Sequence, residues 1–241
     1  MIDIHAHILP GVDDGARSWE ESIAMLKLSY AQGFRHIIAT PHHSRRRGCA
    51  GLYGLAKELQ ERARIHLPDI SIYPGEELFY YDGLGEDLRE GRALTLAESR
   101  FVLVEFGVEI SYSSLYQAVR KLNMERYVPV LAHVERYVCM RENGRMEELR
   151  HLDCRFQMNY ESLKGGFFDR QTRWCRKQVR SGKIHFLGTD MHRLDIRRPD
   201  TVGVVHWMER HVPENLKRAM TDTNAAEIFQ SAKSSLLCRT Q

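Results

Sequence analysis

Two histidines near the start of the chain, His5 and His7, are separated by a single residue, and Asp14 follows them in a glycine-containing loop. Side chains at positions i and i+2 of a β-strand project from the same face, so both imidazoles can enter one cavity. Imidazole and carboxylate groups are together typical ligands of divalent transition metals. We therefore expect a metal site to which His5, His7 and Asp14 each contribute a ligand.

Ligand-type side chains recur along the chain, each at or just after the end of a short apolar segment. Asp190 and His192 follow the segment 184–187, and the pattern repeats earlier in the sequence. In a barrel of parallel strands the catalytic groups lie at the carboxyl ends of the strands. Four carboxylates and five imidazoles suffice for two or three divalent ions that share bridging carboxylates. The further candidate ligands are His42, Glu77 (with Glu76 as the alternative), Glu105 and His133.

Arginines close to these candidate ligands indicate a phosphorylated substrate. Arg136 comes three residues after His133, and Arg197 and Arg198 lie just beyond His192. Guanidinium groups bind phosphate oxygens in a bidentate manner and do not titrate near neutral pH. Divalent ions would activate a water molecule as the nucleophile and clamp the phosphoryl oxygens. We assign Arg136, and one of Arg197 or Arg198, to orienting the phosphate in catalysis.

The segments that carry these residues alternate between strand-like and helix-like patterns. Short β-rich apolar runs predict strands at 2–4, 37–39, 70–73, 101–105, 128–132, 156–158 and 184–187. Amphipathic spacing predicts helices at 18–32, 55–65, 114–123, 146–152, 169–181, 204–210, 214–220 and 224–232. Repeated strand–helix units favour a parallel sheet, and at this length a (β/α) barrel is the economical arrangement.

The composition restricts the function further. A chain of 241 residues suits one domain, and a formal net charge of +3 is too small to indicate a nucleic-acid partner. The five cysteines are scattered without a Cys-x-x-Cys pair, which favours a reducing cytoplasm. Neither a basic leader nor an apolar run of about 18 residues is present, so we expect no secretion and no insertion into a membrane.

Taken in order, these motifs resemble the polymerase-and-histidinol-phosphatase (PHP) superfamily from residue 1 to about residue 229. Within it the chain looks like the bacterial manganese-dependent protein-tyrosine phosphatases of capsular and exopolysaccharide clusters. The resemblance implies one α/β domain over residues 1–241, a distorted (β/α)7 TIM-like barrel with a trinuclear centre. It also implies Mn, with Fe, Zn, Co or Mg as substitutes, and a substrate on the phosphotyrosine tail of a tyrosine autokinase. The motifs that carry it are His5-Ala6-His7, Asp13-Asp14-Gly15, Thr40-Pro41-His42, Gly75-Glu76-Glu77, Val104-Glu105-Phe106, Ala132-His133-Val134-Glu135-Arg136-Tyr137 and Thr189-Asp190-Met191-His192.

Other functions remain open at this point. Histidinol-phosphate hydrolysis would use the same ligands on a small alkyl phosphate. A nuclease would need a basic groove. A non-catalytic module would be expected to lack at least one of the metal ligands. Cys139 and Arg145 have the Cys-x5-Arg spacing of a thiolate phosphatase, but Glu142 between them would repel phosphate. Tyr80 and Tyr81 could stack on a substrate ring, although packing is the favoured interpretation. The sequence leaves the oligomeric state undetermined.

Overall fold

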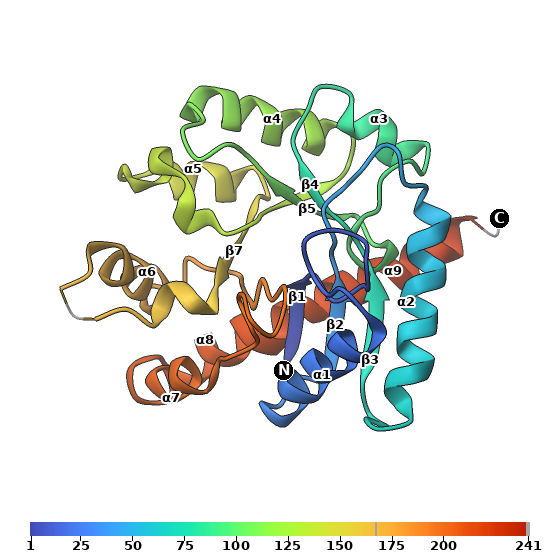
Figure 1. The fold of residues 1–241 in the computed structure, drawn as a ribbon. Coiled ribbons are helices and arrows are strands. Elements are labelled where there is room, and N and C mark those ends of the chain that lie inside the picture. The colour runs from blue at the N-terminus through green and yellow to red at the C-terminus, as the bar shows by residue number, and fades with distance from the viewer. Residues whose placement is uncertain (167, 240–241) are drawn as a thin grey trace.

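The fold is built from parallel strands that alternate with helices (Figure 1). The computed structural model describes residues 1–166 and 168–239, with side chains up to residue 232. Three strands form one sheet in the order β1-β2-β3, and five form a second in the order β4-β5-β6-β7-β8. The strands are β1 (Ile2–Ala6), β2 (His36–Ala39), β3 (Ser71–Pro74), β4 (Glu77–Phe79), β5 (Phe101–Glu105), β6 (Val128–Leu131), β7 (Arg155–Asn159) and β8 (Phe186–Gly188).

Backbone hydrogen bonds connect the two sheets at both of their junctions. Beyond β8, the Asp190 N–H donates to the His5 carbonyl at 2.9 Å, and the His7 N–H donates to the Met191 carbonyl at 2.8 Å. At the other junction the His43 N–H donates to the Glu77 carbonyl at 2.9 Å. The predicted α/β, TIM-barrel-like fold is confirmed, and both junctions lie where the candidate ligands are.

The structure corrects the prediction in the third strand position. The expected strand 70–73 is present as β3, but the chain bends at Gly75 and Glu76 and continues as β4. β3 pairs with β2, whereas β4 pairs with β5. The sequence did not reveal β4 because a three-residue strand that begins with glutamate has no apolar alternation. Counting β3 and β4 as one interrupted strand gives the seven positions of the predicted barrel.

Helices surround the strands, and most lie where the sequence predicts them. α2 begins at residue 49 rather than 55, α3 was not predicted, and a π-helical turn (Ala219–Thr223) joins α8 to α9. Short 3-10 turns lie in the connections between these elements, at Leu96–Glu98, Val134–Arg136, Val138–Arg141 and Tyr160–Leu163. The helices are α1 (Trp19–Ala31), α2 (Cys49–Arg64), α3 (Leu84–Arg89), α4 (Tyr112–Met124), α5 (Arg145–His151), α6 (Arg170–Arg180), α7 (Val202–His211), α8 (Glu214–Arg218) and α9 (Asn224–Arg239).

The last helix covers the amino-terminal ends of the strands. Ala225 and Ile228 of α9 are buried in one apolar cluster with the first residues of β1, β5, β6 and β8, namely Ile2, Phe101, Val128 and Phe186. Apolar burial of this kind stabilises the fold by about 25 cal/mol per Å². The amino-terminal end of the strands is therefore filled with apolar side chains, and the carboxyl end is left for polar groups.

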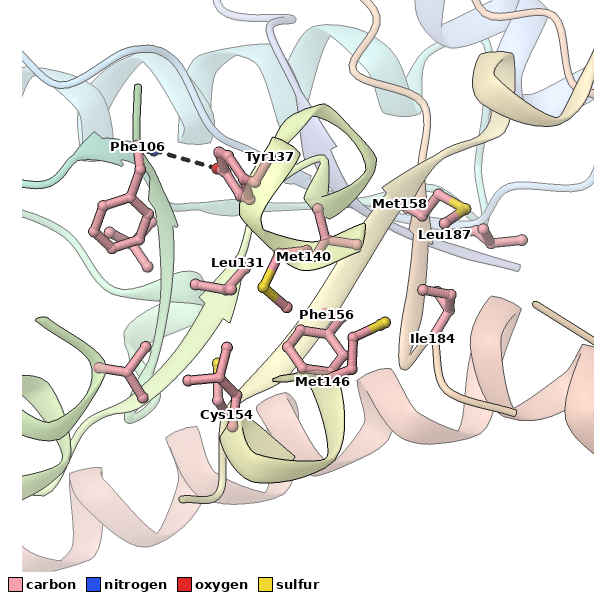
Figure 2. Packing of buried hydrophobic residues seen from close by; sticks show 14 of the residues in the cluster. Phe106, Leu131, Tyr137, Met140, Met146, Cys154, Phe156, Met158, Ile184 and Leu187 are labelled. Carbon is pink, nitrogen blue, oxygen red and sulfur yellow. Dashed lines mark hydrogen bonds between the residues drawn. The ribbon is translucent and has the colours of Figure 1, made fainter. Parts of the chain in front are cut away.

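A second, larger cluster packs helices against the outside of β5–β8. Figure 2 shows Phe156 next to Met146 in this cluster, Met140 between them and Leu131, and the Tyr137 hydroxyl beside the backbone of Phe106. The Phe106 N–H donates to that hydroxyl at 3.2 Å, and the hydroxyl donates to the Ala132 carbonyl at 2.9 Å. Tyr137 thus fixes the ends of two neighbouring strands. Within the described part of the chain, no helix is long and apolar enough to cross a membrane.

Candidate metal centre

The candidate ligands lie together at the carboxyl ends of the strands. β5 shows why, since Phe101 and Leu103 belong to the apolar cluster and Glu105 comes two residues later on the same side of the strand. Three overlapping groups have ligand atoms within 4.8 Å of one another. They are His7, Asp14, His42 and His192; His5, His7 and Asp190; and His42, Glu77 and Glu105. All nine predicted ligands belong to this cluster once His133, which contacts Glu77 and Glu105, is added.

The tautomers of the first two histidines are set by their neighbours. His5 Nδ1 lies 3.1 Å from Gln157 Oε1, and His7 Nδ1 lies 2.7 Å from Asp13 Oδ2. Both partners accept hydrogen bonds, so each Nδ1 carries a proton and Nε2 is the ring nitrogen that faces into the cluster. The two Nε2 atoms are 3.3 Å apart. A positive charge between them, as a proton or a divalent ion, stabilises this arrangement, which fits a metal site.

Glu77 is the central carboxylate of the cluster. Its Oε2 lies 3.3 Å from Nε2 of both His5 and His7 and 3.1 Å from His42 Nδ1. Its Oε1 lies 2.8 Å from His133 Nε2. Two carboxylate oxygens that each face imidazole nitrogens can bridge two ions.

The neighbouring residue Glu76 points elsewhere, to His43 Nδ1 at 3.1 Å and the Leu94 N–H at 2.9 Å. The geometry therefore favours Glu77 over Glu76 as the ligand. His43, which pairs with Glu76, also lies outside the cluster.

Asp190 divides its two oxygens between the histidines and the arginines. Its Oδ1 lies 3.5 Å from Nε2 of His5 and of His7, and its Oδ2 accepts hydrogen bonds from Arg136 at 2.8 Å and Arg197 at 3.2 Å. Both guanidinium groups thus lie at the edge of the cluster. Arg198 makes no such contact and lines a separate pocket of about 280 Å³ beside Arg197.

The carboxylates make the cluster favour positive charge at His7, against the effect of burial. Burial lowers the pKa of His7, but hydrogen bonds to Asp13 and Glu77 outweigh it and raise the pKa to about 10. Burial raises the pKa of the Asp190 carboxyl, but His5 and other positive neighbours outweigh it and hold the pKa at about 2. Glu77 behaves similarly, with a pKa held well below its ordinary value against burial, chiefly by His5. The carboxylates therefore stay ionised and available to divalent ions.

Three residues that orient the ligands were not predicted. Asp13 accepts from both His7 and the His42 N–H, the latter at 2.9 Å. The Gln157 side chain contacts His5 and accepts from the His133 N–H at 2.7 Å, and the Asn159 amide donates to Asp190 at 2.8 Å. Asp13 could have been found from the Asp13-Asp14 pair. For Gln157 and Asn159 the available signal was two polar residues spaced by two in an apolar strand.

The structure also places the remaining candidates. Arg145 donates to the Cys139 carbonyl at 2.8 Å and pairs with Glu142, while burial raises the pKa of the Cys139 thiol. These contacts agree with the rejection of a thiolate phosphatase loop. Tyr80 packs on Phe106, with ring centroids 5.2 Å apart, as the packing interpretation expects.

An acceptor-rich cluster of histidines and carboxylates at the carboxyl ends of parallel strands defines a metal-dependent hydrolase of the TIM-barrel-like type. The sequence narrows this class further. A model of the family described as "Capsular polysaccharide synthesis, CpsB/CapC" matches residues 1–230. The chain belongs to the CpsB/CapC family, and the expected resemblance is confirmed.

Characterised relatives share most of their length with this chain. It is 36% identical over 213 residues to the tyrosine-protein phosphatase CpsB of Streptococcus pneumoniae, covering 83% of this chain and 86% of the relative. It is 32% identical over 228 residues to the tyrosine-protein phosphatase YwqE of Bacillus subtilis, with coverages of 92% and 89%. A chain from the crystal structures of YwqE and CpsB, described as unique metal-dependent tyrosine phosphatases, superposes with a TM-score of 0.83 at 28% identity. That superposition covers 97% of this chain and 94% of the other.

Proposed function

We propose that the chain is a metal-dependent protein-tyrosine phosphatase whose nine clustered histidines and carboxylates hold two or three divalent ions. The observation that carries this proposal is the convergence of ligand atoms within 4.8 Å in three overlapping groups. The nitrogen and oxygen donors without thiolate fit Mn²⁺, with Fe, Zn, Co or Mg as substitutes. The family and the relatives named above support the phosphatase activity.

The residues around the cluster have distinct roles in this proposal. When bound, the ions activate water and offset the charge of the phosphoryl oxygens. Arg136 and Arg197 orient the phosphate, because their guanidinium groups lie beside the cluster and are still partly exposed to solvent. Arg198 is the weaker candidate, since it does not contact the cluster. Asp13 and Gln157 hold His7 and His5 with a lone pair directed inward.

The surroundings of the cluster favour an aryl phosphate over an alkyl phosphate. Around the ligands, the described side chains include guanidinium groups, amides and the Asp13 carboxylate, whose pKa is held at about 2, and none is an obvious dedicated proton donor. A phenolate leaving group has a pKa of about 10, several units below that of an alkoxide, and departs without a general acid. Phosphotyrosine satisfies this requirement, whereas phosphoserine and histidinol phosphate do not.

The proposed partner is the phosphotyrosine tail of a bacterial tyrosine autokinase that controls capsular polysaccharide assembly. The description of the family as acting in capsular polysaccharide synthesis supports this setting. We further propose that residues 1–241 act as one domain in the cytoplasm. Cys49, Cys139, Cys154 and Cys175 are free thiols, which suits a reducing compartment, and the Cys238 side chain is not among those described.

A substrate panel with and without metal tests the proposal. With added Mn²⁺ we expect turnover of a phosphotyrosine peptide to exceed that of a phosphoserine peptide and of histidinol phosphate by at least about tenfold. Exhaustive chelation should abolish turnover, and thiol alkylation should not. Single-stranded DNA serves as the negative control substrate. Faster chemistry on histidinol phosphate, or full activity without metal, would contradict the assignment.

A further inference from the structure

Phe79 is an exposed aromatic side chain at the mouth of the candidate metal centre. It is 57% exposed and ends β4, two residues after Glu77. In the parallel pairing of β4 with β5, Phe79 is in register with Glu105. Side chains two residues apart on a strand project from the same face, so Phe79 lies on the side of Glu77 and one step further toward solvent.

The two tyrosines that follow Phe79 are already engaged in other contacts. The Tyr80 ring stacks on Phe106, and the Tyr81 hydroxyl donates to Asp87 at 2.5 Å. The Arg45 guanidinium lies over the Tyr81 ring at 4.3 Å from its centroid. Phe79 is the one of these three rings that lies within β4, on the face that carries Glu77.

Two further exposed apolar residues follow the next two strands of the same sheet. Val108, after β5, is 50% exposed, and Val138, after β6, is 55% exposed. The Val138 N–H donates to the Val108 carbonyl at 3.3 Å, so the two loops are held together. Val138 also comes two residues after Arg136, which contacts the cluster. Single exposed apolar residues are ordinary, but these three lie at or beyond the carboxyl ends of three adjacent strands, β4, β5 and β6, the end that carries the cluster.

We propose that Phe79 is a specificity-determining residue that contacts the phenyl ring of phosphotyrosine. The inference rests on the proposed phosphatase function and identifies the part of the protein that recognises the ring. In phosphotyrosine one oxygen separates the ring from phosphorus, so a phosphate at the cluster places the ring just above the ligands, at the level of Phe79. A strand residue supplies this contact at low entropic cost because its backbone is already fixed.

Competitive inhibition by phosphonates separates ring binding from leaving-group chemistry. Benzylphosphonate keeps the spacing between ring and phosphorus, and methylphosphonate lacks the ring; neither is hydrolysed. The measured quantity is the ratio of the two inhibition constants in the Mn²⁺-loaded enzyme. An aromatic contact of this kind contributes about threefold to tenfold in affinity. We expect Phe79→Ala to lower the preference for benzylphosphonate by that factor.

Three further variants keep the test decisive. Phe79→Trp should retain the preference for benzylphosphonate, and Phe79→Leu should lose most of it. These two variants test the role of Phe79 even if the alanine variant folds poorly. Met124→Ala, which removes a 79% exposed side chain at the end of α4, should leave the ratio unchanged. An unchanged ratio in both Phe79→Ala and Phe79→Leu would overturn the role of Phe79. The proposed function fails on a different result, namely absent phosphotyrosine turnover by the unmodified enzyme.

Discussion

At the scale of single residues, two of the candidate ligands have an unusual backbone conformation. His133 and Asp190 have φ angles of 33° and 50°, in the left-handed region that costs a non-glycine residue about 1 kcal/mol or more. Each lies two residues after the end of a strand, β6 and β8. Because Val130 and Ala132 alternate into the apolar interior, the left-handed turn lets His133 point into the cluster instead of to the opposite face. We interpret this strain as the cost of presenting these ligands, offset by the surrounding contacts.

The proposed metal-holding and phosphate-holding roles fall on two different residues of one short motif, His133 and Arg136. Arg136 contacts Asp190 through an oxygen that faces away from the histidines, whereas His133 contacts Glu77 and Glu105 directly. We expect Arg136→Ala to lower kcat/KM by one to two decades, or about 1.5 to 3 kcal/mol, with metal content nearly unchanged. His133→Ala should lose metal.

Metal analysis by mass spectrometry alongside steady-state kinetics distinguishes the two variants. Arg136→Lys is the matched control, because it keeps the charge and loses the planar fork. Its activity should fall between those of the unmodified enzyme and Arg136→Ala. Equal metal loss in Arg136→Ala and His133→Ala would contradict the division of roles.

The convergence of the nine candidate ligands could be predicted from the sequence, but the contacts of Gln157 and Asn159 could not. Most of the nine lie near the carboxyl end of a short apolar strand, where the active sites of parallel barrels are found. Gln157 and Asn159 act through contacts with His5, His133 and Asp190, and these contacts exist only after β7 is placed beside β6 and β8. Their roles depend on packing between strands distant in the sequence, which residue type and spacing do not encode.

At the scale of elements, the loop after β1 depends on one close backbone approach. A Cβ atom on Gly15 would lie 2.2 Å from the His7 carbonyl oxygen and 2.7 Å from His7 Cβ. The Ala16 N–H donates to the same carbonyl at 3.1 Å. Gly15 therefore lets the loop that carries Asp13 and Asp14 fold back against His7.

We expect Gly15→Ala to lower turnover about tenfold or more and to weaken metal binding, because Asp14 and His7 must move apart. Gly107→Ala is the matched control, since Gly107 also lies in a loop after a strand and a Cβ there meets nothing within 4 Å. Metal titration followed by activity measures both effects. Similar metal affinities in the two variants would show that the close approach is not required.

Element boundaries were predicted least well where local sequence conflicts with tertiary packing. Ser18 caps α1 by accepting from the Glu21 N–H at 3.3 Å, whereas the Glu21 side chain accepts from the Arg17 N–H and not from that of Ser18, so the capping box is incomplete. The strand interruption at Gly75 and Glu76 has no local signature, because it arises where the two sheets meet. Strongly periodic segments, such as α1 and β5, matched their predicted ranges closely.

At the scale of the whole molecule, His185 joins three elements at the end of the barrel opposite the metal centre. Its Nδ1 accepts from the Phe156 N–H at 3.0 Å, which links β8 to β7. Its carbonyl accepts from the Asn224 side chain at 2.9 Å, at the start of α9. Burial, followed by the nearby Arg155 and Arg150, lowers the pKa of His185 to about 3. The folded protein therefore holds this histidine neutral.

This pKa determines the direction in which stability changes with pH. In the unfolded chain a histidine titrates near pH 6.5, so between about pH 6.5 and pH 3 the unfolded state binds a proton that the folded state does not. The free energy of unfolding thus falls as the pH falls through this range, by up to about 1.4 kcal/mol per pH unit from this residue. Above pH 6.5 the contribution is constant.

His185→Asn should remove this dependence while keeping an acceptor for the Phe156 N–H, because the asparagine oxygen occupies nearly the position of Nδ1. Urea unfolding at pH 7 and pH 5, in a chelator so that metal does not contribute, gives the change in free energy for each protein. Between pH 7 and pH 5 the free energy of unfolding of the unmodified chain should fall by up to about 2 kcal/mol more than that of the variant. The other titrating groups contribute equally to both proteins, so they cancel in this difference. Equal losses in the two proteins would show that His185 is protonated in the folded state without cost.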